Sequence, residues 1–262
     1  MFVRKHNLLV IAGPCVVEGE DKCFAIAEKL VELFNPLPID FVFKASFDKA
    51  NRSSHESFRG IGLVKGLDIL DCIKRELYTP ILTDVHNEKE ADIAATFVDI
   101  LQIPAFLCRQ TDLVTACGKT GKYVNVKKGQ FMSAADMGNV VKKIEATGNN
   151  KIIITERGNS FGYNNLVADM RNMTWLKEHG YPVIFDATHS VQKPGGAGTA
   201  SSGDAELAPS LACASIAAGA DGVFIETHLN PSEALSDKDT MIAFDKMEQL
   251  VLQLSHIKEV VS

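Results

Sequence analysis

The sequence has few of the features that secreted or membrane-bound proteins need. Its six cysteines contain no C-x-x-C pair and no dense cluster, which argues against a disulfide-stabilised scaffold and favours a reducing cytoplasm. The first apolar run, LLVIAG at 8–13, is too short for the apolar region of a signal peptide and is followed at once by proline. No other run approaches the length of a membrane span. We therefore expect a soluble, cytoplasmic protein with no membrane partner.

An excess of positive charge is also missing. Lysine and arginine total 27 against 33 aspartate and glutamate residues, and the net charge of −6 argues against nucleic acid as a partner. Anionic substrates must therefore be held by local clusters of cations. No linker interrupts the 262 residues, and the 46% hydrophobic content is enough for a sizeable core, so we expect one domain over 1–262.

Short apolar or β-branched runs alternate with segments of helical spacing, such as 23–34, 66–77 and 205–218. Eight strands alternating with helices predict an α/β fold, a single-domain (β/α)8 TIM barrel. The alternative is a doubly wound open sheet, which is disfavoured by the count of eight and by the lack of a G-x-G-x-x-G motif after the first run. The expected strands are 8–13, 41–44, 80–85, 100–105, 123–128, 151–156, 181–188 and 221–227.

A cluster of cations and hydroxyls follows the second run, FVFK. Lys44, Lys49, Arg52, Ser53 and Ser54 all fall at the end of this run or in the loop after it. Ammonium, guanidinium and hydroxyl groups are the donors that bind phosphate and carboxylate oxygens. Because the active site of a barrel is built at the carboxyl ends of its strands, we expect this loop to bind an anionic substrate.

A second pair of cations ends two neighbouring strands. We expect Lys127 and Arg157 to clamp one phosphate, while Arg52 and Ser53 clamp another, which suggests two phosphorylated substrates. Lys127 shares a strand face with Asn125, so alternation predicts that it points into the barrel. The alternative for each cation is a solvated surface position. The sequence does not rank the candidate acid–base groups, which are Asp48, Asp84, His86 and Asp186.

Barrel closure brings the last strand beside the first. Cys15, His189 and Glu226 then share one sector of the rim, within reach of Asp237 on the loop after the last strand. One thiolate, one imidazole and two carboxylates suit a divalent transition metal. The residues alone also allow a buried structural Cys15 and a hydrogen-bonded core His189. His228 is a competing ligand that spacing does not exclude.

Several long motifs, spread over essentially the whole chain, resemble one family. They are IAGPC (11–15), FKASFDKANRSS (43–54), SFRG (57–60), TDVH (83–86), QIPAFLCRQTDL (102–113), VNVKKGQF (124–131), TERG (155–158), FGYNNL (161–166), DATHSVQ (186–192) and ETH (226–228). On these motifs the chain resembles the 3-deoxy-D-manno-octulosonate 8-phosphate synthases. Of the two kinds in this family, the chain resembles the metal-dependent one, which has cysteine at the position of Cys15, whereas the metal-independent one has asparagine there. The resemblance implies a (β/α)8 barrel that condenses phosphoenolpyruvate with D-arabinose 5-phosphate and water, releasing inorganic phosphate, a step in lipopolysaccharide precursor synthesis.

The resemblance also implies roles for individual residues. It implies one divalent metal (Fe²⁺, Mn²⁺, Zn²⁺ or Co²⁺) and a homotetramer in which Arg109 reaches the site of a neighbouring subunit. The metal ligands would be Cys15, His189, Glu226 and Asp237. The phosphoenolpyruvate site would comprise Lys44, Lys49, Lys127, Arg157 and the backbone of Ala105. The arabinose-phosphate site would comprise Asn51, Arg52, Ser53 and Arg109. Gln102 would be a further substrate-binding residue, and the catalytic residues would be Lys49, Asn51, His86 and His189.

Other functions remain open at this point. The 3-deoxy-D-arabino-heptulosonate 7-phosphate synthases use erythrose 4-phosphate and similar metal ligands, but their sugar-side loop is typically KPRTS, whereas this chain reads KANRSS at 49–54. A Schiff-base aldolase would use Lys44 or Lys127 as a desolvated nucleophile. A non-catalytic sugar-phosphate-binding barrel would bind these ligands without releasing phosphate.

Overall fold

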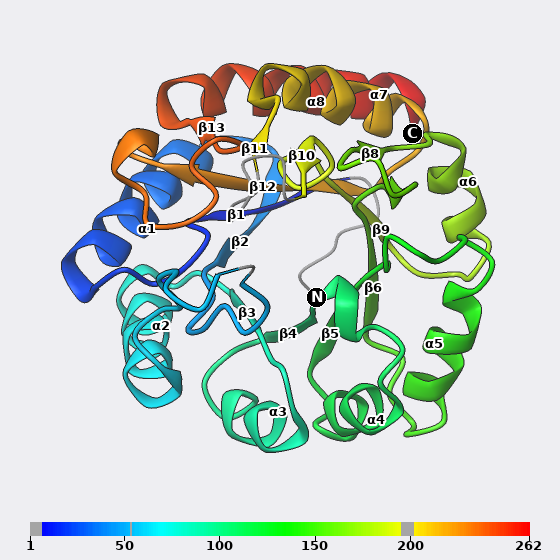
Figure 1. Ribbon diagram of the computed structural model, residues 1–262. Coiled ribbons are helices and arrows are strands. Elements are labelled where there is room, and N and C mark those ends of the chain that lie inside the picture. Colours follow the sequence, from blue (N-terminus) through cyan, green and yellow to red (C-terminus); the bar gives the residue numbers. More distant parts are fainter. Residues whose placement is uncertain (1–6, 53, 195–201) are drawn as a thin grey trace.

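Parallel strands that close on themselves form the centre of the molecule. The computed structural model describes residues 7–52, 54–194 and 202–262. Within these residues eight strands pair in parallel in chain order, and the last returns to the first, with Leu9 opposite Gly222 and Gly13 opposite Glu226. This closed ring, visible in Figure 1, confirms the predicted barrel. Its strands are β1 (Leu8–Gly13), β2 (Ile39–Lys44), β3 (Ile81–Asp84), β4 (Ile100–Ile103), β5 (Tyr123–Lys127), β6 (Ile152–Glu156), β9 (Val183–Asp186) and β12 (Gly222–His228).

Helices surround the barrel (Figure 1). In the first of them, α1 (Glu20–Phe34), Cys23, Ile26 and Leu30 are buried at the spacing of three or four residues that defines one helix face. Among the described residues, no helix combines the length and apolar character needed to cross a membrane. The other helices are α2 (Leu63–Leu77), α3 (Glu88–Ala94), α4 (Thr111–Lys119), α5 (Met137–Glu145), α6 (Arg171–Lys177), α7 (Ala208–Ala217) and α8 (Met247–Val261).

Shorter elements lie in the connections. Antiparallel pairs join β7 (Asn159–Ser160) to β8 (Leu166–Val167) and β10 (Gln192–Lys193) to β11 (Ser202–Gly203). The short strand β13 (Ile242–Ala243) pairs in parallel with the carboxyl end of β12. The 3₁₀ turns are η1 (Ala105–Leu107), η2 (Ala205–Leu207), η3 (Pro231–Glu233) and η4 (Phe244–Lys246).

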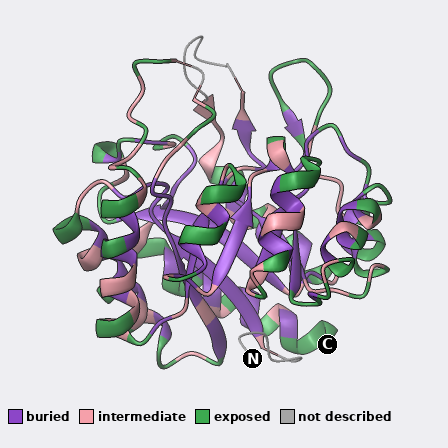
Figure 2. Cartoon of the chain, turned by 90° about the horizontal axis from the view of Figure 1, so that it is seen from below, coloured by how far each residue is buried: buried purple, intermediate pink, exposed green. Residues whose placement is uncertain are grey.

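The barrel interior changes from apolar to polar along the strands. Every second strand residue faces inward, and one interior cluster consists of Leu9, Ile11, Val42, Leu82, Ile100, Ile153, Ile184 and Phe224. Figure 2 shows these strands buried at the centre of the molecule. Two residues further along, inward positions become polar, as with Lys44, Asp84, Gln102, Asp186 and Glu226. The predicted inward direction of Lys127 is confirmed, because its Nζ lies 2.6 Å from Asp186 Oδ2 on β9.

Glycine permits the closest approach of β12 to β1. A Cβ at Gly222 would lie 2.1 Å from the carbonyl oxygen of Leu9, so no larger residue fits without moving the strands apart. Closure at this point carries Glu226, four residues along β12, to the segment that leads into Cys15.

Candidate active site

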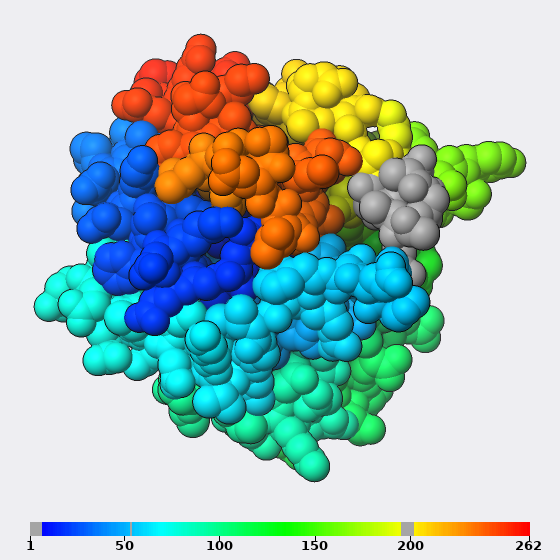
Figure 3. Space-filling model, turned by 60° about the vertical axis from the view of Figure 1, so that its left-hand side comes forward, coloured from blue at the N-terminus to red at the C-terminus, as the bar shows by residue number. Residues whose placement is uncertain are grey.

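A cavity of about 610 Å³ opens at the carboxyl ends of the strands. On the surface in Figure 3, the segment after β2 (light blue) lies against the segment after β12 (orange), and a hydrogen bond from Arg52 to Ser236 joins them. Predicted site residues that line the cavity are Lys49, Asn51, Arg52, His86, Gln102, Ala105, Lys127, Arg157, His189 and Asp237. The predicted residues Cys15, Lys44 and Glu226 are buried and bond to this lining or to one another.

Two predicted residues are not placed in the cavity. Arg109 is exposed on the segment after η1 and is absent from the described lining, while its carbonyl accepts a hydrogen bond from Lys143. This position is compatible with the prediction that Arg109 serves a neighbouring subunit. Ser53 lies outside the described residues.

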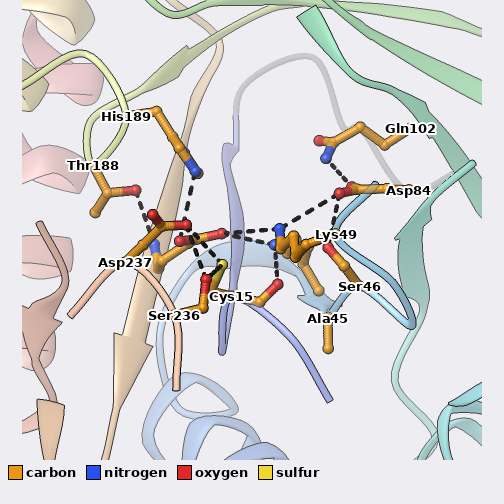
Figure 4. Close-up of polar contacts among 12 residues, drawn as sticks. Cys15, Ala45, Ser46, Lys49, Asp84, Gln102, Thr188, His189, Ser236 and Asp237 are labelled. Carbon is orange, nitrogen blue, oxygen red and sulfur yellow. Dashed lines mark hydrogen bonds and ion pairs between the residues drawn. The ribbon is translucent and has the colours of Figure 1, made fainter. Parts of the chain in front are cut away.

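Three predicted metal ligands meet at one side of the cavity. The ligand atoms of Cys15, Glu226 and Asp237 all lie within 4.8 Å of one another. The fourth predicted ligand is adjacent, since His189 Nε2 lies 3.6 Å from Glu226 Oε2. Figure 4 shows Cys15, His189 and Asp237 converging on this point, with Lys49 and Asp84 facing them.

The ring of His189 is held from behind. Its Nδ1 lies 3.0 Å from Asp186 Oδ1, and its backbone N–H donates to the same oxygen at 2.9 Å. An ionised carboxylate can only accept hydrogen bonds, so Nδ1 carries the hydrogen and the lone pair of Nε2 is free to bind a metal ion. A carboxylate behind an imidazole in this way is typical of metal-binding histidines.

Glu226 provides the test of whether these residues fit a cation. Burial raises the pKa of its carboxyl group, but the positive charges of Lys44 and Lys49 outweigh this and hold the pKa well below its usual range. Its Oε1 accepts from Lys44 at 2.8 Å, whereas the buried Oε2 has no hydrogen-bond partner among the described residues. A buried, ionised oxygen of this kind needs a partner, and the neighbouring thiol and imidazole make a divalent transition metal the fitting one.

Cys15 is the predicted ligand whose ionisation depends most on a nearby cation. Burial, with the carboxylates of Asp237 and Glu226, raises the pKa of its thiol well above the usual range. Its Sγ lies 2.9 Å from Asp237 Oδ2 and 2.8 Å from Ser236 Oγ. Because a metal binds the thiolate, ion binding and loss of this proton are coupled.

His228, the competing ligand, belongs to a different contact. Its Nδ1 lies 2.7 Å from the carbonyl oxygen and 3.0 Å from the backbone nitrogen of Asn230, and its Nε2 lies 3.8 Å from Glu18 Oε2. In the described part of the chain it is not among the residues whose ligand atoms gather with Cys15.

Cations face the carboxylates across the cavity. Lys49 Nζ lies 3.6 Å from Asp84 Oδ2 and 3.9 Å from Glu226 Oε1. Burial raises the pKa of Asp84, but Lys49 and Lys44 outweigh it and hold the pKa well below its usual range. Burial lowers the pKa of Lys127 despite the opposing charge of Asp186. The site therefore holds fixed charges of both signs in one cavity.

Arg157 has spare capacity to bind an anion. Its Nη2 donates to Gln192 Oε1 at 3.0 Å, but the buried Nη1 has no hydrogen-bond partner among the described residues. A guanidinium nitrogen left free in this way suits a phosphate oxygen. The same cavity thus contains an unpaired donor for an anion and, at Glu226, an unpaired acceptor for a cation.

Comparison with known proteins decides the family. A model described as the DAHP synthetase I family matches residues 4–262. The chain belongs to the DAHP synthetase I family.

Several proteins similar to this chain are named 2-dehydro-3-deoxyphosphooctonate aldolase. The relative from Desulfatibacillum aliphaticivorans is 53% identical over 255 residues, 97% of this chain and 93% of the relative. The one from Protochlamydia amoebophila is 51% identical over 257 residues, 98% and 94% of the two chains. The one from Syntrophotalea carbinolica is 50% identical over 260 residues, 99% and 94%.

The printed name of these relatives is an alternative name of the octulosonate 8-phosphate synthases. The predicted resemblance is therefore confirmed.

Two neutral amides in the cavity were missing from the predicted site. Gln192 accepts a hydrogen bond from Arg157 and donates one to Asp237 Oδ1 at 3.3 Å. It therefore links the Arg157 guanidinium to Asp237, a predicted metal ligand. Gln130 also lines the cavity, and its buried Oε1 has no hydrogen-bond partner among the described residues. The signal was their place in the motifs DATHSVQ and VNVKKGQF, since an amide carries no charge that would single it out.

Lys128 faces away from the cavity and is expected to stabilise the loops behind it. It is fully buried, and its Nζ lies 3.5 Å from the buried Glu156 Oε2 and 3.2 Å from the carbonyl oxygen of Met132. Lys128→Met leaves the carboxylate of Glu156 buried without its cation, so we expect it to lower the free energy of unfolding by about 3–5 kcal/mol in urea titration. Adding Glu156→Leu removes the unpaired charge and should recover much of the loss. A single substitution that costs less than about 1 kcal/mol would contradict this account.

Proposed function

We infer that this chain condenses phosphoenolpyruvate with D-arabinose 5-phosphate and water to give 3-deoxy-D-manno-octulosonate 8-phosphate and inorganic phosphate. The observation that carries the inference is that one cavity brings two sets of residues together. The proposed metal ligands Cys15, His189, Glu226 and Asp237 lie at one side, and Lys49, Lys127 and the unpaired Nη1 of Arg157 lie in the same cavity. The names of relatives about half identical to this chain support the five-carbon sugar over erythrose 4-phosphate.

The phosphoenolpyruvate is proposed to bind among the cations at the cavity floor. Lys127 and Arg157 would hold its phosphate, Lys49 and Lys44 its carboxylate, and the backbone at Ala105 would complete the site. The unpaired Arg157 nitrogen and the cavity position of Lys127 support this assignment. Anions in such a low-dielectric site interact more strongly with these cations than they do in water.

The sugar phosphate is proposed to bind nearer the mouth, against Asn51, Arg52 and Ser53. Arg52 now donates to Ser236 Oγ and lies 3.8 Å from Asp237 Oδ2. A phosphate dianion would compete for this guanidinium. We further propose a cytoplasmic homotetramer of single-domain subunits, with Arg109 of one subunit completing the sugar-phosphate site of the next.

The chemistry requires the two substrates to be aligned and their charges balanced. C3 of phosphoenolpyruvate bonds to the aldehyde carbon, the sugar oxygen gains a proton, water supplies the oxygen at C2, and phosphate leaves with the electrons of its C–O bond. The cations fix both substrates and offset the phosphate charge, which reduces the entropic and electrostatic parts of the barrier. Gln102 and His86 line the same cavity and are proposed to contact substrate there.

Cys15, His189, Glu226 and Asp237 would hold one divalent metal. Such an ion, when bound, would supply a positive charge that can polarise an aldehyde oxygen or lower the pKa of a water. The choice among Fe²⁺, Mn²⁺, Zn²⁺ and Co²⁺ belongs to this proposal, since a mixed sulfur, nitrogen and oxygen set suits several of them.

Acceptor choice tests the function. Purified protein should release phosphate from phosphoenolpyruvate when arabinose 5-phosphate is added, with kcat/KM at least roughly a hundredfold above that for erythrose 4-phosphate. Preference for the four-carbon sugar would transfer the chain to the heptulosonate 7-phosphate reaction.

A further inference from the structure

A glutamate at the start of α3 forms hydrogen bonds with His86. Glu90, in the first turn of this helix, accepts two hydrogen bonds on one oxygen: the backbone N–H of His86 lies 2.8 Å from Oε2, and His86 Nδ1 lies 2.9 Å from it. The ring of His86 lines the cavity, and its other nitrogen, Nε2, has no hydrogen-bond partner among the described residues.

The carboxylate of Glu90 is itself held on its second oxygen. Asn87 caps α3, accepting the backbone N–H of Glu90 at 3.0 Å and donating its side-chain amide to Glu90 Oε1 at 2.7 Å. In an ordinary capping box the third helical residue reaches back to the backbone of the cap itself. Here Glu90 reaches one residue further, to His86, so the cap of the helix also fixes a cavity side chain.

The hydrogen-bond chemistry determines which nitrogen of His86 carries its hydrogen. Burial raises the pKa of Glu90, but the hydrogen bonds from His86 outweigh it and lower the pKa below its usual range. An ionised carboxylate only accepts, so Nδ1 is the protonated nitrogen of the neutral ring and Nε2 is an acceptor. On another side the ring packs edge-on against Phe47, with centroids 5.8 Å apart, which restricts its rotation.

We propose that Glu90 is a positioning residue for the condensation, holding His86 so that Nε2 of the neutral ring accepts a hydrogen bond from a substrate hydroxyl or a water in the cavity. This inference rests on the proposed function for its substrate but not for its geometry. The other charged groups near the pair are Asp84 on β3 and Arg59, which is bound to Asp48.

A double-mutant cycle between Glu90 and His86 tests the proposal. Glu90→Ala should lower kcat roughly tenfold to hundredfold with little change in the KM for phosphoenolpyruvate, the range seen when a group that orients a reactive side chain is removed. In a His86→Ala background the same substitution should change kcat by less than about twofold, because coupled residues are not additive. Glu90→Gln keeps an acceptor oxygen for Nδ1–H and should recover most of the rate.

The matched control is Glu88→Ala, an exposed carboxylate in the same first turn of α3. It should leave kcat unchanged while causing a similar small loss of helix stability. Effects of Glu90→Ala and His86→Ala that simply multiply would overturn the positioning role and leave Glu90 as a helix cap only.

A second measurement separates this proposal from the function itself. Imidazole ¹⁵N shifts of histidine-labelled protein, assigned with a His86→Gln sample, should report the Nδ1–H form in the wild type and its loss in Glu90→Ala. This readout needs no turnover. An Nε2–H form in the wild type would refute the orientation, whereas inactivity with arabinose 5-phosphate, together with the expected shifts, would refute only the proposed function.

Discussion

Lys127→Met is expected to lower kcat/KM for phosphoenolpyruvate by roughly a hundredfold to a thousandfold, the cost of truncating one partner of a buried, hydrogen-bonded charge pair. Lys127 Nζ lies 2.6 Å from Asp186 Oδ2 and 3.7 Å from the centre of the Phe224 ring, so its ammonium group is fixed at the cavity wall. Methionine fills a similar volume without charge. Steady-state kinetics at varied phosphoenolpyruvate measures the effect.

Two comparisons make the Lys127 result interpretable. Lys142→Met removes an exposed lysine from α5 and should leave kcat/KM unchanged. The thermal midpoint of Lys127→Met should be checked, since Asp186 also holds His189. A folded Lys127→Met enzyme with kcat/KM within about threefold of wild type would show that Lys127 does not hold the phosphate.

Removal of divalent metal is the second change with a large expected effect. Chelation followed by dialysis should reduce the rate of phosphate release by at least roughly a hundredfold. The reason is that the four proposed ligands, Cys15, His189, Glu226 and Asp237, would then hold no Lewis acid. Activity should return when Mn²⁺, Co²⁺, Fe²⁺ or Zn²⁺ is added, to extents that differ between the ions. Glu226→Gln removes the negative charge of the unpaired oxygen. After the same dialysis, this variant should retain fewer than about one metal ion per ten subunits, a loss of metal content of roughly tenfold or more.

Metal content gives a readout that does not depend on turnover. Elemental analysis of Glu226→Gln should be compared with Glu206→Gln, an exposed carboxylate in η2 that should leave metal content at the wild-type level. Full activity in protein shown to be metal-free would contradict a catalytic metal and leave Cys15, His189, Glu226 and Asp237 as structural residues.

The sequence predicted the barrel because its signals are local and repeated. Each strand contains an apolar or β-branched run, and alternation along β5 was enough to place Lys127 inward and Lys128 outward. Closure then followed from topology, so Cys15 and Glu226 could be expected near each other although they are far apart in the chain.

Contacts made between loops were beyond the reach of such patterns. Ser236 touches Cys15 and Arg52, yet a serine in a loop has no periodicity that could reveal a partner in a distant segment. Asp237 adopts a φ of 49°, a conformation that the sequence does not signal for aspartate. The hydrogen bond between Glu90 and His86 has one indication in the sequence, Asn87 followed three residues later by Glu90. That pattern predicts the start of a helix and not a contact with a cavity residue.

The most direct test of the central claim is to follow the carbon label from [3-¹³C]phosphoenolpyruvate in the presence of arabinose 5-phosphate and metal-loaded protein. We predict that ¹³C NMR will find the label at C3 of an eight-carbon 2-keto acid phosphate, formed in equal amount to the inorganic phosphate released. Label recovered in pyruvate, or a substrate adduct trapped on Lys44 or Lys127 by borohydride, would contradict the condensation proposed here.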